Sequence, residues 1–274
     1  MPNLSLEITP PPEEVNEFKA TPIFVFLHGS WHRAKHFDPL RRRLEELGAQ
    51  TETDVHVVAD DLPIDQPGIG ADYIAQDVAR KIDMPEMTIL SAHSSAGNIG
   101  ARTAAILEDQ GTPLSHLVYL NAGFEKSNNE HFSAGQKKRI PRKFRHRDYL
   151  FNALTYIRDP RLEVYNPLLV RRDFYNDCPR DVADWAISHM RPMYRDRNSP
   201  PVPRWPLTPS TYIYGTQDQV INPEYSRYVA QSIGAHPIAV EAGHSGYISQ
   251  PEHHAKLLFE VAARSLGLPT KKLD

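Results

Sequence analysis

The sequence predicts an α/β fold in which a mostly parallel central sheet is flanked by helices, and three observations support this prediction. Short apolar runs alternate with longer segments of helical periodicity over residues 21–120, which is typical of strands joined by crossover helices. The same alternation returns from residue 207 onward. A chain of 274 residues is also long enough to bury the core of one large domain.

The first part of the chain contains four predicted strands and three predicted helices. The strands are the apolar runs at residues 23–27, 55–59, 87–92 and 116–120. The helices are the periodic segments at residues 36–47, 71–82 and 95–109. Each helix is predicted to end where glycine or proline chemistry stops it, near Gly48, Asp83 and Gly111.

Residues 123–206 interrupt this order. The segment is rich in charged, aromatic and proline residues and has no run typical of a strand of the sheet. We interpret it as an inserted helical cap, and residues 1–122 and 207–274 as the core domain. The segment is called the insertion below.

The insertion contains one clear amphipathic segment, and the sheet pattern resumes after it. Residues 181–190 predict a helix that packs on the core, because one helical face carries Val182, Trp185, Ala186 and His189. Beyond the insertion, strands are predicted at residues 211–214 and 237–241, and helices at residues 223–233 and 252–265.

An apolar strand runs directly into a small-residue helix through a pair of serines. In a nucleophile elbow, strand and helix approach closely, so the residues two before and two after the nucleophile must be small. Ala92 and Ala96 meet this requirement for Ser94, whereas the bulky His93 occupies one of these positions for Ser95. The usual pattern has glycine at both positions. Ser94 is the predicted nucleophile, and the alternative is a serine pair that caps a helix.

A serine nucleophile needs a base, and the base needs an orienting carboxylate. Asp218 follows the predicted strand at residues 211–214, and His244 follows the next predicted strand. Loops after parallel strands open on one edge of the sheet, so these side chains are expected to meet Ser94 there. Nucleophile, acid and base occur in the chain order Ser, Asp, His, which is one of three common triad orders.

The loop after the first predicted strand is a candidate oxyanion hole. The backbone N–H groups of Ser30 and Ser95 are predicted to stabilise an oxyanion, since both follow strands that end at the same edge. Trp31 and His32 are predicted substrate contacts, with packing under the insertion as the alternative. Trp185 in the insertion is predicted to face the pocket.

These motifs resemble the α/β-hydrolase superfamily, and within it the methylesterase and hydroxynitrile-lyase branch. The resemblance covers almost the whole chain and rests on H-G-S-W-H (residues 28–32), V-A-D-D-L-P (58–63), A-H-S-S-A-G (92–97), T-Q-D-Q-V-I-N-P-E (216–224), A-G-H-S (242–245) and M-R-P (190–192). It implies an α/β-hydrolase fold and a triad of Ser94, Asp218 and His244.

Two positions favour ester hydrolysis over other chemistries of this superfamily. The residue after His244 is Ser245, where hydroxynitrile lyases of the branch carry the lysine that helps to hold cyanide. The nucleophile is a serine rather than the aspartate of haloalkane dehalogenases. The sequence therefore predicts a carboxylesterase-like serine hydrolase that acts on a small-molecule carboxylic ester, with a methyl ester, thioester or lactone as variants. A lyase that uses the same triad and a non-catalytic small-molecule receptor stay open as alternatives.

Composition excludes several other classes. The chain has 31 Lys and Arg against 34 Asp and Glu, and its net charge of -3 provides no basic field for nucleic acid. No apolar run approaches the roughly 18 residues of a membrane span. The single cysteine, Cys178, excludes an intramolecular disulfide.

No cofactor and no metal are expected, because the sequence lacks a nucleotide-binding glycine motif and a metal-binding spacing. The N-terminal residues lack the pattern of a secretory signal, so the expected location is the cytoplasm. A homodimer is left open. Eight basic residues lie between Lys126 and Arg147 with one acid, Glu130, and predict either a gate for an anionic substrate or a solvated surface.

Overall fold

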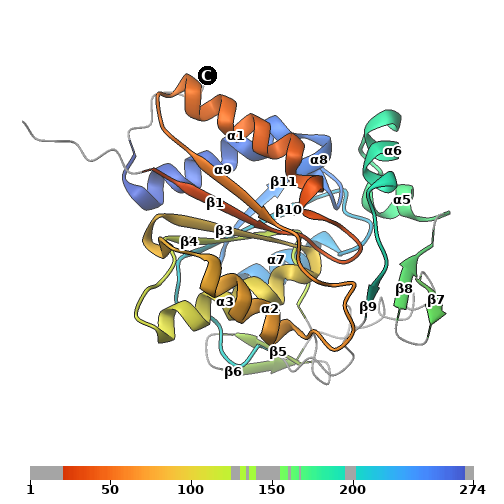
Figure 1. Ribbon diagram of the computed structural model, residues 1–274, viewed down its shortest axis with the longest axis horizontal. Coiled ribbons are helices and arrows are strands. Elements are labelled where there is room, and N and C mark those ends of the chain that lie inside the picture. Colours follow the sequence, from red (N-terminus) through yellow and green to blue (C-terminus); the bar gives the residue numbers. More distant parts are fainter. Residues whose placement is uncertain are drawn as a thin grey trace, which may run out of the picture.

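The computed structural model describes residues 21–124, 130–133, 136–139, 155–159, 162–166, 168–194 and 202–268. A six-stranded parallel sheet forms its centre, with the strand order β11-β10-β4-β3-β1-β2 (Figure 1). The strands are β1 (Ile23–Leu27), β2 (His56–Asp60), β3 (Thr88–His93), β4 (His116–Leu120), β10 (Ser210–Gly215) and β11 (His236–Val240). The predicted parallel α/β fold is confirmed.

Helices cover both faces of this sheet (Figure 1). One face is covered by α1 (Asp38–Gln50), α8 (Gly246–Ser249) and α9 (Pro251–Leu266). The other face is covered by α2 (Ala71–Lys81), α3 (Gly97–Asp109) and α7 (Pro223–Ile233). The molecule therefore has three layers, and the sheet is buried between two layers of helices.

The alternation of side chains along the strands builds a separate core on each face. In β1, Phe24 and Phe26 belong to the cluster that contains the buried side chains of α1 and α9. Val25 and Leu27 belong to the cluster that contains those of α2 and α3. Because both faces are buried, the strand is apolar throughout, which is why it reads as a continuous hydrophobic run in the sequence.

The first helix ends two residues beyond the predicted position near Gly48, and this glycine does not stop it. A short 3₁₀ helix occupies Ala34–Phe37, α1 begins at Asp38 with a proline in its first turn, and it continues through Gly48 to Gln50. Gly48 serves packing instead, because a Cβ there would lie 2.8 Å from a side-chain carbon of Val55. The other predicted core elements are confirmed with small shifts of their ends.

The insertion contributes no described strand to the central sheet, but it is not purely helical. Its two helices are α5 (Val170–Phe174) and α6 (Arg180–Ser188). Its strands form two small antiparallel sheets, β5 (Glu130–Ser133) with β6 (Gln136–Arg139), and β7 (Thr155–Asp159) with β8 (Leu162–Tyr165) and β9 (Met193–Tyr194). The expectation of a helical cap did not include these strands, because short hairpins in charged sequence lack the apolar runs of a buried strand.

Two further expectations concern membrane-spanning helices and the basic run of the insertion. Among the helices of the described ranges, none has the length and apolar character needed to cross a membrane. The side chains of the basic run between Lys126 and Arg147 lie outside the described residues.

Several histidines are buried as neutral rings. His28, His36 and His254 are each at most 4% exposed. Burial lowers the pKa of each from 6.5 to about 4, because a charged ring would lose its hydration. Each ring is instead held by hydrogen bonds to the backbone.

The buried histidines predict a loss of stability in mild acid. Between about pH 4 and pH 6.5 the unfolded chain binds more protons than the folded chain, so the free energy of unfolding falls as the pH is lowered. Each histidine contributes a slope of up to about 1.4 kcal/mol per pH unit. Urea unfolding across this range measures the slope.

A matched pair of variants in α9 identifies the source of the slope. His254→Gln should reduce it, whereas His253→Gln, at an exposed neighbour, should leave it unchanged. Equal slopes in these two variants would contradict the assignment.

Candidate active site

Three loops bring Ser94, His244 and Asp218 together at the carboxyl edge of the sheet. Ser94 follows β3, Asp218 follows β10 and His244 follows β11. The Nε2 atom of His244 lies 3.0 Å from the Oγ atom of Ser94, and its Nδ1 atom lies 2.8 Å from Oδ2 of Asp218. The three side chains form one line of hydrogen bonds, in the arrangement that activates a serine hydroxyl.

Ser94 occupies a sharp turn between β3 and the helix that follows. Its φ of 53° lies in the left-handed region, which is unusual for a residue with a side chain. Strand and helix are close here, because a Cβ added to Gly100 of α3 would lie 2.8 Å from the Cβ of Ala92. The small side chain of Ala92 is thus explained by this close approach.

Asp218 is held in one orientation by three hydrogen bonds. Its Oδ1 atom accepts from the backbone N–H groups of Val220, at 2.7 Å, and Ile221, at 2.8 Å, while Oδ2 accepts from His244. The side chains of Asp218 and His244 are 1% and 0% exposed. With Nδ1–H donating to the carboxylate, the Nε2 lone pair of His244 faces the hydroxyl of Ser94.

Asn121, which the sequence did not single out, connects the loops that contain Asp218 and His244. It follows β4, has a φ of 42° and is 5% exposed. Its amide nitrogen donates to the backbone oxygens of Gly243, at 3.1 Å, and His244, at 2.8 Å, and its Oδ1 accepts from the N–H of Gly215 at 2.7 Å. A polar residue directly after a predicted strand is the signal that points to it.

The loop after β1 lies directly against Ser94. A Cβ added to Gly29 would lie 2.6 Å from the Cβ of Ser94, so only glycine allows this approach. The Oγ atoms of Ser30 and Ser95 are 2.8 Å apart. The two predicted oxyanion residues are therefore adjacent, and Ser95 lies at the start of a helix, where backbone N–H groups lack intrahelical partners.

Trp31 and His32 lie under the insertion. Trp31 is 2% exposed and its ring packs on those of Tyr165 and Phe174, with centroids 5.0 Å and 6.0 Å away. His32 is fully buried, donates from Nδ1 to the backbone oxygen of Ser30 at 2.8 Å, and accepts at Nε2 from the Tyr175 hydroxyl at 3.0 Å. Both residues pack under the insertion, which was the alternative to substrate contact. Their contact with substrate stays a prediction.

Trp185 lies in α6 of the insertion. It is half-buried, and its ring packs on His36 at 6.0 Å and on His189 at 5.1 Å. Among its described ring contacts none is with the three residues of the hydrogen-bonded line. Its role in a substrate pocket also stays a prediction.

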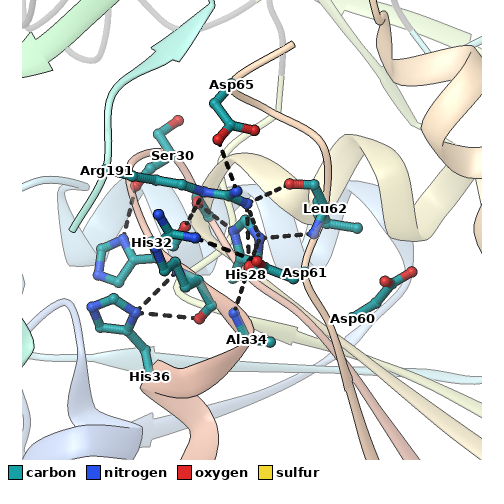
Figure 2. A network of polar contacts seen from close by, with 12 residues as sticks. His28, Ser30, His32, Ala34, His36, Asp60, Asp61, Leu62, Asp65 and Arg191 are labelled. Atoms are coloured by element: carbon teal, nitrogen blue, oxygen red, sulfur yellow. Dashed lines mark hydrogen bonds and ion pairs between the residues drawn. The ribbon is translucent and has the colours of Figure 1, made fainter. Parts of the chain in front are cut away.

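Arg191 of the insertion binds two loops of the core, those that follow β1 and β2 (Figure 2). Its buried guanidinium donates to the backbone oxygen of Leu62 and pairs with Asp61 and Asp65, each at 3.2 Å. Its backbone N–H donates to the oxygen of Trp31 at 2.9 Å. The loop that contains Ser30 is thereby held from the side of the insertion.

His28 completes this network as a neutral ring. Its Nε2 accepts from the N–H of Leu62 at 3.0 Å, so the proton is on Nδ1, which donates to the backbone oxygen of Gly29 at 2.9 Å. Burial, and to a smaller extent the charge of Arg191, lowers its pKa to about 4. A neutral His28 can lie beside the guanidinium without charge repulsion.

In the part of the chain that the structure describes, no group of three or more His, Cys, Asp or Glu side chains is arranged to hold a metal ion.

Solved structures similar to this chain have the same fold. The structure of polyneuridine aldehyde esterase has 19% identity and a TM-score of 0.65, with 88% of this chain and 99% of that chain covered. A pyrethroid hydrolase from Sphingobium faniae JZ-2 has 19% identity and a TM-score of 0.64, with 88% and 97% covered. A variant of tomato methylketone synthase I, complexed with beta-ketoheptanoate, has 14% identity and a TM-score of 0.65, with 89% and 99% covered.

A search of curated protein sequences found no match. The model of the alpha/beta hydrolase family, in contrast, matches residues 24–253, a range that includes Ser94, Asp218 and His244. The family match, the parallel sheet and the similar structures agree with the resemblance that the motifs showed. This chain belongs to the alpha/beta hydrolase family.

Proposed function

We propose that the protein is a cofactor-free serine hydrolase that cleaves a small-molecule carboxylic ester through an acyl-enzyme. The observation that carries this proposal is the line of hydrogen bonds from Asp218 through His244 to Ser94, with Ser94 in a strained turn. The similar structures include proteins named as an esterase and as a hydrolase, which supports this class of reaction. Methyl esters, thioesters and lactones are close variants of the same chemistry.

The first step is acylation. The hydroxyl of Ser94 transfers its proton to Nε2 of His244 as the oxygen attacks the ester carbonyl, and a tetrahedral oxyanion forms. The protonated His244 then gives this proton to the leaving alcohol, and the bond between carbonyl carbon and alkoxy oxygen breaks. Asp218 stabilises the imidazolium through the contact with Nδ1, which measures 2.8 Å.

The second step is hydrolysis of the acyl-enzyme. His244 takes a proton from water, the water oxygen attacks the acyl carbonyl, and the proton returns to Ser94 as the acid leaves. In both steps the backbone N–H groups of Ser30 and Ser95 are the proposed donors to the oxyanion. In this proposal the insertion, residues 123–206, acts as the cap that covers the substrate.

Replacement of Ser94 tests the proposal directly. The wild type should hydrolyse members of a panel of short- and medium-chain p-nitrophenyl esters, and Ser94→Ala should abolish turnover because the nucleophile is lost. Circular dichroism should show an unchanged fold. Ser188→Ala, at an exposed serine of α6, is the matched control and should keep full activity.

The same panel separates the open alternatives. A covalent acyl adduct on Ser94, detected by mass spectrometry during turnover, would exclude a lyase that uses the triad without acylation. Tight binding of a small molecule with no product after prolonged incubation would favour a receptor and contradict the proposal.

Asp218→Asn should leave the fold intact and lower kcat by about 10⁴-fold. The Oδ1 atom of asparagine would keep the bonds from Val220 and Ile221, so its amide would face Nδ1 of His244. The imidazole would then accept at Nδ1 and carry its proton on Nε2, which prevents it from taking the serine proton. Steady-state kinetics measure kcat, and a kcat near that of the wild type would show that the carboxylate does not set the tautomer.

Asn121→Ala should lower both stability and kcat. It leaves the N–H of Gly215 and the oxygen of Gly243 without their side-chain partner, while the oxygen of His244 keeps its contact with Nε2 of His93 at 3.2 Å. Each group left unsatisfied costs about 1–3 kcal/mol. The loops of acid and base then lose their common anchor. Urea unfolding and kinetics below the unfolding transition measure the two effects, and unchanged kcat in the folded variant would rule out a positioning role.

A further inference from the structure

Two hydroxyl groups meet beside the proposed nucleophile. The hydroxyl of Ser30 donates to that of Ser95 over 2.8 Å, although the residues are 65 positions apart in the chain. Ser30 belongs to the loop after β1, and Ser95 directly follows Ser94. The contact thus joins the two segments whose backbone N–H groups are the proposed oxyanion donors.

One of the two hydroxyl protons is not used in the hydrogen bond between these serines. Each hydroxyl has one proton and two lone pairs, so one mutual hydrogen bond leaves one O–H free to donate. Within the described ranges neither hydroxyl has a second partner. Two other serines donate to strong acceptors instead: Ser249 to the carboxylate of Asp177 at 2.6 Å, and Ser188 to the backbone oxygen of Trp185 at 2.7 Å. The free O–H is accessible, because Ser95 is exposed.

The position of Ser30 is imposed by buried neighbours. The Tyr175 hydroxyl donates to Nε2 of His32 at 3.0 Å, and Nδ1 of His32 donates to the backbone oxygen of Ser30 at 2.8 Å. Both rings are at most 1% exposed, and burial keeps His32 neutral by lowering its pKa. On the other side of Ser30, Gly29 lies against Ser94. The backbone of Ser30 is therefore held on both sides, and its hydroxyl lies next to that of Ser95.

We propose that the hydroxyl of Ser95 is a third, side-chain donor to the oxyanion, and that Ser30 is the positioning residue that orients it. The inference rests on the proposed function and extends it. As Ser94 attacks, the electron pair of the C=O π bond moves to oxygen, and the Ser95 hydroxyl hydrogen-bonds to this oxygen while keeping its proton. Such a donor is set before the reaction begins, so it lowers the barrier without reorganisation.

The test is a set of variants at both serines. Ser95→Ala should lower kcat by about 10²-fold, the lower end of the range for removal of a single oxyanion donor, while KM changes by less than about 2-fold. Ser30→Ala should lower kcat in the same way but less, because Ser95 keeps its hydroxyl. Ser95→Thr keeps the hydroxyl and should restore kcat. The double alanine variant should be no slower than Ser95→Ala, since the residues act as a unit.

Affinity for an analogue of the intermediate is the second measurement. The inhibition constant of a trifluoromethyl ketone should rise by the same factor by which kcat/KM falls, because the ketone forms the same oxyanion. Ser188→Ala is again the matched control and should change neither quantity.

The outcomes separate this inference from the proposed function. If the wild type hydrolyses no ester, the proposed function fails and this inference fails with it. If the wild type is active and Ser94→Ala is inactive, but Ser95→Ala keeps the kcat of the wild type, only the third donor is refuted. A loss of kcat in Ser95→Thr equal to that in Ser95→Ala would also overturn it, because the hydroxyl would not be the group that matters.

Discussion

Parallel pairing of β3 with β1 on one side and β4 on the other is the constraint on which the whole site depends. Because these three strands are parallel, their carboxyl ends lie at the same edge of the sheet. Gly29, Ser94 and Asn121, which follow them, therefore lie side by side. The next strands, β10 and β11, continue the same row and end before Asp218 and His244. An antiparallel neighbour would place one of these loops at the opposite edge.

Close backbone contacts then set the positions of these loops relative to one another. The loop after β1 reaches Ser94 only because Gly29 has no side chain, and α3 reaches β3 only because Ala92 and Gly100 are small. Asn121 fixes the loops of Asp218 and His244 relative to each other through three hydrogen bonds. The residues around the proposed site are therefore constrained in size and hydrogen bonding, not only in reactivity.

The insertion and the core are joined through buried side chains, among them Arg191, whose charge is balanced by two exposed carboxylates. Arg191 lies between two carboxylates and two backbone oxygens, and the ring beside it, His28, is held neutral. Tyr175 and His32 form a second connection, which ends at Ser30. Buried polar groups of this kind specify one arrangement, because any other arrangement leaves donors or acceptors without partners. The loop with the proposed oxyanion donors is thus held from both sides.

Sequence periodicity by itself determined the layers of the fold, because the burial of both faces of a parallel sheet demands apolar runs separated by helical segments. It also placed Ser94, Asp218 and His244, the residues of the proposed triad, at the ends of predicted strands. Local patterns did not show the strands of the insertion, the continuation of α1 through Gly48, or the anchoring role of Asn121. These features arise from contacts between residues far apart in the chain, such as the 2.8 Å bond between Ser30 and Ser95, and only the tertiary structure brings such residues together.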